Sequence, residues 1–174
     1  MPPKIPLPDD ADLDPESREI LAKLPPLNVF RMWANAPASF RPLVEFAFSL
    51  LAKSEFDARK REIAILRVAH ATRASYEWFQ HVIVAKRVGV TDEEIEKIGV
   101  DGPVTKLDEE GNLLCRVADE ISNEVRLSDD ALQKILDRYG TRQATELILC
   151  VSYFNLLSRF LESTRVELEE ESPL

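Results

Sequence analysis

The sequence is poor in glycine and cysteine, with five glycines and two cysteines among 174 residues. Cys115 and Cys150 form no C-x-x-C pair and no regular series of spacings, which excludes a disulfide scaffold and a zinc-binding module. Both cysteines fall within apolar helical segments, so we expect buried and unreactive thiols. This pattern is typical of a protein in a reducing cytoplasm.

Long apolar stretches are also missing. The longest covers residues 147–157, about half of the ~20 residues that a membrane span needs, and Ser152 and Asn155 interrupt it. Residues 1–8 contain four prolines and lack the apolar core of a secretion signal. We therefore expect neither a membrane segment nor export.

Positive charge is in short supply, since the formal net charge is −9 and the sequence pI is about 4.8. Nucleic-acid binding depends on clustered Lys and Arg that displace counterions, so a nucleic-acid partner is not expected. Hydrophobic residues make up 45% and charged residues 30%, which is typical of a globular chain and not of a disordered one. A chain of this length can bury a core of its own without metals or disulfides.

What the sequence does contain is a series of helical patterns, and no segment alternates like a β-strand. The glycines fall where helices should end, and Gly140 separates the last two. Asp14 followed by Pro15 predicts a helix start, and Thr91 with Glu94 predicts a capping box. The predicted helices cover about residues 15–24, 28–35, 39–53, 58–72, 75–89, a segment from 91, 108–125, 128–139 and 141–166.

These patterns predict an all-α, single-domain helical bundle. We expect an extended N-terminal arm over residues 1–13, because of its prolines, and a helical domain over residues 14–166. Residues 167–174 contain four glutamates and should form a solvated, frayed acidic tail.

Ionisable side chains interrupt the apolar faces of two neighbouring predicted helices. Glu77 and His81 are four residues apart on one stripe, so their side chains can meet. Glu62 lies among core positions of the preceding helix, with Arg73 on the same face. A buried carboxylate is unfavourable unless it is paired or protonated. The pattern therefore allows either structural ion pairs, such as Glu62 with Arg73 or Glu77 with His81, or working acids and bases.

A metal site is an alternative use of these residues, in which His70 would join His81, Glu62 and Glu77 as ligands. Two histidines and two glutamates match a non-haem site in composition, but the spacing lacks the Glu-x-x-His pairs of di-iron bundles. We expect His70 to be a core or interface residue, and we expect no metal and no cofactor.

Residues 61–81, continuing through residues 89–95, resemble the signature of the carboxymuconolactone decarboxylase and alkylhydroperoxidase D superfamily. In its peroxidase branch, a glutamate is followed by a C-x-x-C and then a histidine. On this chain the glutamate falls on Glu62 and the histidine on His81, whereas Ala74 and Glu77 occupy the cysteine positions. Thiol peroxidase chemistry needs a low-pKa thiolate and a resolving partner, so this activity is not expected.

The Tyr-Glu-Trp-x-x-His form of residues 76–81 resembles instead the non-thiol, decarboxylase-like branch. The resemblance implies an alkylhydroperoxidase D-like bundle that assembles as a dimer, trimer or hexamer. It also implies a cofactor-independent lyase or related acid/base enzyme acting on a small carboxylated or lactone substrate. The implied catalytic residues are Glu62, Glu77 and His81, and the implied substrate-binding residues are Arg73, Tyr76 and Trp78. The alternative is a catalytically silent oligomeric binding protein of the same fold.

Overall fold

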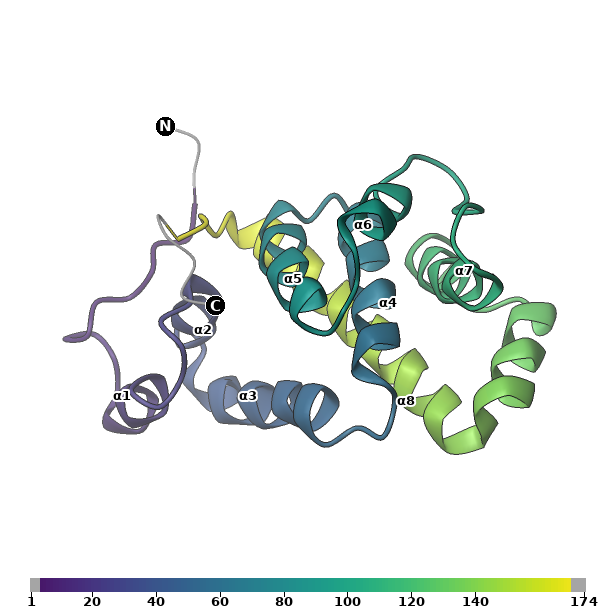
Figure 1. Ribbon diagram of the computed structural model, residues 1–174. Coiled ribbons are helices and arrows are strands. Elements are labelled where there is room, and N and C mark those ends of the chain that lie inside the picture. Colours follow the sequence, from purple (N-terminus) through teal and green to yellow (C-terminus); the bar gives the residue numbers. More distant parts are fainter. Residues whose placement is uncertain (1–3, 170–174) are drawn as a thin grey trace. The chain divides into compact units, whose positions relative to one another are not determined.

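The computed structural model describes residues 4–169 as α-helices joined by short loops, with no strand in that range (Figure 1). The predicted all-α class is confirmed. The helices divide between two compact units. The described part of the first comprises residues 4–53 and 160–169, and the second comprises residues 54–159. The sequence did not predict this division, and residues 170–174 of the expected acidic tail lie outside the described range.

The first unit contains three helices of the N-terminal part: α1 (Pro15–Leu21), α2 (Asn28–Trp33) and α3 (Pro37–Ala52). Asp14 caps α1 as predicted, since its side chain accepts a hydrogen bond from the Ser17 backbone N–H. The helix ends at Leu21, three residues earlier than predicted, and the N–H groups of Lys23 and Leu24 donate instead to carbonyls three residues back.

Within the first unit, residues 4 and 5 and residue 28 contact residues 164–169. The Ile5 N–H donates to the Thr164 carbonyl at 3.2 Å, and Lys4 forms an ion pair with Glu167 at 2.7 Å. The Asn28 N–H donates to the side chain of Glu169 at 2.5 Å. The acidic side chains of Glu167 and Glu169 therefore have donors in the N-terminal segment, while the side chain of Glu167 stays 72% exposed. The expected frayed tail stays a prediction.

The second unit contains α4 (Ala58–Ala71), α5 (Ser75–Arg87), α6 (Asp92–Ile98), α7 (Glu109–Glu124) and most of α8 (Asp129–Thr164). Asp57 and Asp108 cap α4 and α7. The capping box at α6 is confirmed, with Thr91 and Glu94 each bonding the backbone of the other. These caps place the helix starts close to the predicted residues.

Helix α4 is the core of the second unit and packs against α5, α6 and α7, as Figure 1 shows. Residues 61–69 are all buried, including Arg67. The Arg67 guanidinium donates to the carbonyls of Ile98, Val100 and Gly102 and pairs with Asp119 at 2.6 Å. These hydrogen bonds and the ion pair compensate the burial of the Arg67 guanidinium. They also hold the loop after α6 against the core.

Helix α8 is two helices joined at Gly140, as predicted. This residue has φ 69° and ψ 172°, a conformation that glycine adopts without a side-chain clash. By length and composition, α8 is long and apolar enough to cross a membrane. This finding differs from the prediction that the chain has no membrane segment. Within the protein, 56% of the most apolar stretch of α8 is buried, as is usual for a core helix.

Candidate functional site

Three ionisable side chains meet where α4 lies beside α5. The Nδ1 atom of His81 is 2.7 Å from Oε2 of Glu62, and its Nε2 atom is 3.6 Å from Oε2 of Glu77. The imidazole therefore lies between a carboxylate from each helix. We call Glu62, Glu77 and His81 the carboxylate–imidazole cluster.

The turn between α4 and α5 creates this juxtaposition. After Thr72, Arg73 adopts a left-handed conformation with φ 56°, and the Ala74 N–H donates back to the Ala69 carbonyl at 2.9 Å. This is the hydrogen-bond pattern of a Schellman motif, in which glycine is the usual left-handed residue. The chain reverses at once, so α5 packs along α4.

The cluster is almost completely withdrawn from solvent. The side chains of Glu62, Glu77 and His81 are 1%, 4% and 12% exposed. Oε2 of Glu77 is buried and accepts no hydrogen bond from the described residues, so the His81 Nε2 atom is its counter-charge. Only the imidazole has an appreciable exposed surface, which makes it the member that a small molecule can approach.

Burial and neighbouring charges raise the pKa values of two members of the cluster. Burial raises the pKa of Glu77 to about 7; the attraction of His81 opposes the rise, and the charge of Glu62 adds to it. Burial alone would lower the pKa of His81, but the charge and hydrogen bond of Glu62, together with Glu77, outweigh burial and raise it. The cluster can therefore exchange a proton near neutral pH.

Phe154 of α8 contacts the cluster, and the sequence did not predict this contact. The ring of Phe154 meets the His81 ring edge to face, with centroids 4.8 Å apart. One turn earlier, burial raises the pKa of the Cys150 thiol to about 12, and Arg61 and Glu62 are the charges that act on it. Cys150 and Phe154 belong to the apolar stretch of residues 147–157, but an apolar stretch does not reveal which side chains it contacts.

The predicted substrate-binding residues are not gathered in one place. Helical spacing predicted that Arg73 lies on the same face of α4 as Glu62. In the structure Arg73 lies beyond the end of α4, and its side chain is exposed. The backbone reversal after Thr72 explains the difference, because it takes residue 73 out of the helical repeat. Tyr76 is buried in the first turn of α5, at 2% exposure. Their predicted roles stay predictions.

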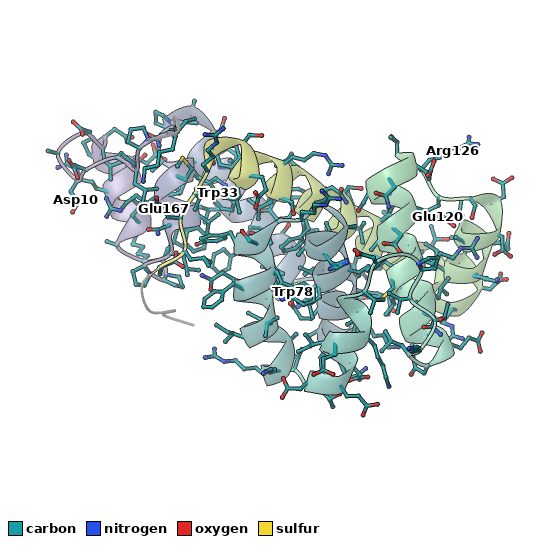
Figure 2. The ribbon with its side chains drawn as sticks, turned by 90° about the horizontal axis from the view of Figure 1, so that it is seen from above. Asp10, Trp33, Trp78, Glu120, Arg126 and Glu167 are labelled. Carbon is teal, nitrogen blue, oxygen red and sulfur yellow. The ribbon has the colours of Figure 1, made fainter. Side chains whose placement is uncertain are left out.

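Trp78 packs on a different set of residues. Its ring lies edge to face with that of His70, at 6.0 Å, and a Cβ atom on Gly99 of α6 would come within 3.0 Å of it. Figure 2 shows the position of Trp78 on α5. His70 also approaches Asp101, at 3.5 Å, and not the carboxylate–imidazole cluster. In residues 4–169, no group of three or more His, Cys, Asp or Glu side chains is placed to hold a metal ion.

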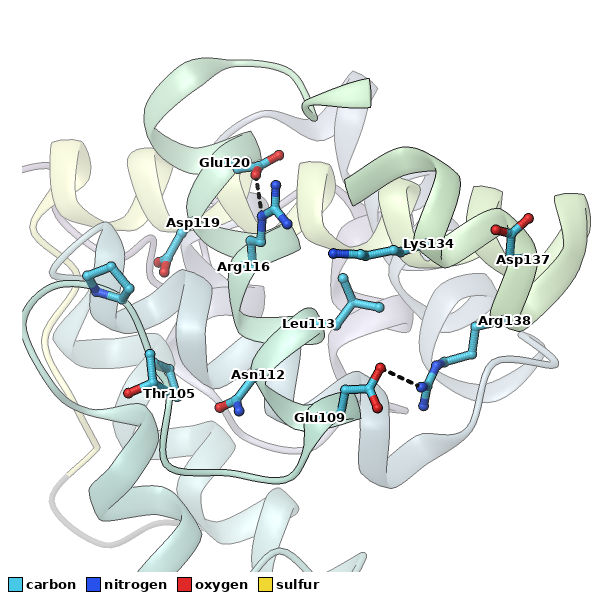
Figure 3. Close-up of a pocket in the computed structure, with 12 residues that line it drawn as sticks. Thr105, Glu109, Asn112, Leu113, Arg116, Asp119, Glu120, Lys134, Asp137 and Arg138 are labelled. Carbon is cyan, nitrogen blue, oxygen red and sulfur yellow. Dashed lines mark hydrogen bonds and ion pairs between the residues drawn. The ribbon is translucent and has the colours of Figure 1, made fainter. Parts of the chain in front are cut away.

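A groove of about 770 Å³ lies elsewhere in the second unit, between α7 and the first part of α8 (Figure 3). Charged side chains line most of it, and Leu113 contributes an apolar side chain. Arg116 pairs with Glu120 at 2.7 Å, and Arg138 approaches Glu109 at 3.5 Å. These cations are already matched by carboxylates on the groove wall.

Residues 37–101 match the model of the carboxymuconolactone decarboxylase family, a range that contains the whole cluster. No curated protein matches the chain. Crystal structures of similar fold include that of an alkylhydroperoxidase AhpD core, an uncharacterized peroxidase-related protein from Ralstonia eutropha JMP134. It has a TM-score of 0.83 and 16% identity, and the alignment covers 98% of this chain and 94% of that one.

Two further structures share the fold. An uncharacterized peroxidase-related protein from Silicibacter sp. TM1040 has a TM-score of 0.78 and 16% identity, over 97% of this chain and 92% of its own. A protein of unknown function from Agrobacterium tumefaciens, suggested to be an antioxidant defence protein, has a TM-score of 0.66 and 16% identity, over 79% and 94%. The family match over residues 37–101 supports a relation to the carboxymuconolactone decarboxylase and alkylhydroperoxidase D-like superfamily, and the three crystal structures share the fold of this chain.

Proposed function

We propose that this protein is a cofactor-independent acid/base enzyme, a decarboxylase-like lyase that acts on a small carboxylated or lactone substrate. The observation that carries the proposal is the imidazole of His81 between the carboxylates of Glu62 and Glu77. General acid/base catalysis needs a group whose pKa lies near the working pH, and the pKa of Glu77 is about 7.

The proposed reaction assigns a role to each member of the cluster. In a carboxylated unsaturated lactone, the carbon–carboxylate bond breaks, carbon dioxide leaves, and the electron pair moves to the ring carbonyl as a dienolate. The proton that His81 carries on Nε2, beside Glu77, then moves to carbon, and solvent restores it through the partly exposed imidazole. Glu62 holds the imidazole through Nδ1 and stabilises its charged form.

The names of the structural neighbours suggest a peroxidase-related role, which the proposal does not adopt. Ala74 and Glu77 stand where the thiol branch has cysteines, so a thiolate nucleophile is missing from the cluster. Burial raises the pKa of the two thiols, Cys115 and Cys150, to about 12. Both are therefore protonated at neutral pH. A reductant-dependent peroxide assay that detected turnover would argue against this choice.

Substitution of the cluster tests the proposal against a panel of unsaturated lactone acids, with carbon dioxide release as the measurement. Glu62→Gln, Glu77→Gln and His81→Ala should each reduce turnover by about 100-fold or more. We expect all three variants to stay folded, with melting temperatures lowered by no more than about 10 °C. Glu110→Gln is the matched control, because Glu110 is a partly buried carboxylate of the same unit that pairs with Lys60.

The alternative function is a catalytically silent binding protein of the same fold. The 1% exposure of Glu62 favours it, because a buried ion pair can be retained for structure alone. Unfolding of all three cluster variants, with no turnover of any panel member by the wild type, would establish this alternative.

A further inference from the structure

The aromatic contact on His81 lies outside the matched family segment and outside the cluster itself. Phe154 belongs to α8, and its ring plane makes an angle of 86° with the imidazole plane. Phe154 is 2% exposed and meets a second buried ring, that of Tyr153, at 5.3 Å and 88°. A fixed aromatic wall therefore stands against one side of the imidazole.

The two carboxylates do not hold the imidazole equally. The contact from Nδ1 to Glu62 has hydrogen-bond length, at 2.7 Å, whereas the contact from Nε2 to Glu77 is longer, at 3.6 Å. The second torsion angle of a histidine side chain has no sharp intrinsic preference. Since one short hydrogen bond leaves the ring free to tilt, the packing around it has to define its plane.

We infer that Phe154 is a positioning residue, which holds the His81 ring so that Nδ1 faces Glu62 and Nε2 faces Glu77. Its catalytic consequence rests on the proposed function, but its effect on the imidazole does not. With the ring held, the neutral imidazole keeps its proton on Nδ1, where Glu62 accepts it, and Nε2 is left to exchange protons with Glu77 or substrate. Without the wall, the ring tilts and both tautomers become populated.

Several other ionisable groups surround His81 and bear on its titration. Glu62 and Arg61 face it from α4, and Glu77 faces it from its own helix. On α8, burial raises the pKa of the Tyr153 phenol, and the charge of Glu77 adds to the rise. Because Phe154 carries no charge, its substitution leaves all these charges in place. A change in the His81 tautomer on removal of this ring then reports on orientation.

Nitrogen NMR of the imidazoles tests the inference directly, because the chain has two histidines. His70 serves as the internal reference, since its aromatic neighbour is Trp78. In Phe154→Leu we expect the His81 nitrogens to shift toward a mixture of tautomers above the His81 pKa, while the His70 signals stay unchanged. Where turnover is measurable, kcat should fall about tenfold or more with KM nearly unchanged.

Matched variants separate orientation from general loss of packing. Phe56→Leu removes a buried ring of the same unit, which packs on Tyr139 at 5.2 Å, and should leave the His81 nitrogens unchanged. Phe154→Tyr keeps the wall and should retain the wild-type tautomer. If the leucine variant fails to fold, Phe154→Met fills the space with a flexible chain and carries the same expectation.

The outcomes distinguish this inference from the proposed function. Wild-type His81 nitrogen shifts in folded Phe154→Leu or Phe154→Met would overturn the positioning role, even if turnover depends on the carboxylate–imidazole cluster. A changed tautomer in a protein with no turnover would support the positioning role and count against the proposed function. A tautomer that changes equally in Phe56→Leu would also overturn the inference, because the effect would then follow any loss of aromatic packing.

Discussion

The carboxylate–imidazole cluster and the groove beside α7 both hold carboxylates next to cationic groups, but they differ in burial. Glu62 is 1% exposed in the cluster, whereas Asp130, at the groove, is 57% exposed. Asp130 does not line the groove itself but pairs with Arg116 and Lys134, which do. Hydrogen bonds from these two cations lower the pKa of Asp130, while burial raises the pKa of Glu77 to about 7. The same residue types thus give inert ion pairs in water and a protonatable site in the core.

The largest expected effect is a pH dependence of stability that the cluster creates. The pKa of Glu77 rises from 4.5 in the unfolded chain to about 7 in the folded one. Between these values the folded state binds more protons, so the free energy of unfolding should fall as pH rises, by about 3 kcal/mol. The raised pKa of His81 acts in the same direction above pH 6.5.

Urea denaturation at several pH values from 4.5 to 8 measures this dependence. Glu77→Gln removes the titrating carboxyl, so its curve should be flatter than that of the wild type. Stability that is constant or rises over this range in the wild type would mean that Glu77 stays ionised, and the contrast with the groove would disappear.

An intermediate effect is expected when the short bond to the imidazole is weakened. Glu62→Gln removes the charge that overcomes burial at His81, so the pKa of His81 should fall below its ordinary value. The lost charge-assisted hydrogen bond should lower the free energy of unfolding by about 1–3 kcal/mol. Histidine NMR titration and urea denaturation measure the two effects, and an unchanged His81 pKa would contradict the first.

The smallest effect is expected at the groove. Arg116→Met breaks the ion pairs with Glu120 and Asp130, which are 18% and 57% exposed, and should reduce stability by about 1 kcal/mol or less. The difference should shrink further in 1 M salt, because exposed charges are screened. Denaturant curves at low and high salt measure it. A loss of several kcal/mol would show that exposure does not separate the two regions.

Local patterns in the sequence were sufficient to predict the helices and the proximity of Glu77 to His81. Capping residues such as Asp57, Thr91 and Asp108 act on the nearest turn, so the helix starts were predictable. The spacing of Glu77 and His81 on one helix likewise determines that their side chains can meet. Glu62 was predictable as a site residue because it interrupts the apolar face of its helix.

The tertiary structure alone decided which groups surround the imidazole. Glu62 is bonded to His81 because a left-handed residue at Arg73 reverses the chain, and Arg73 itself is thereby turned out of the helix. Phe154 reaches the same imidazole from 73 positions further along the chain. Contacts between distant segments depend on how whole helix faces pack, and helical periodicity in one segment carries no information about the partner face. The sequence thus determined that Glu62, Glu77 and His81 interrupt apolar helix faces, and the packing of α4, α5 and α8 determined that these side chains lie together.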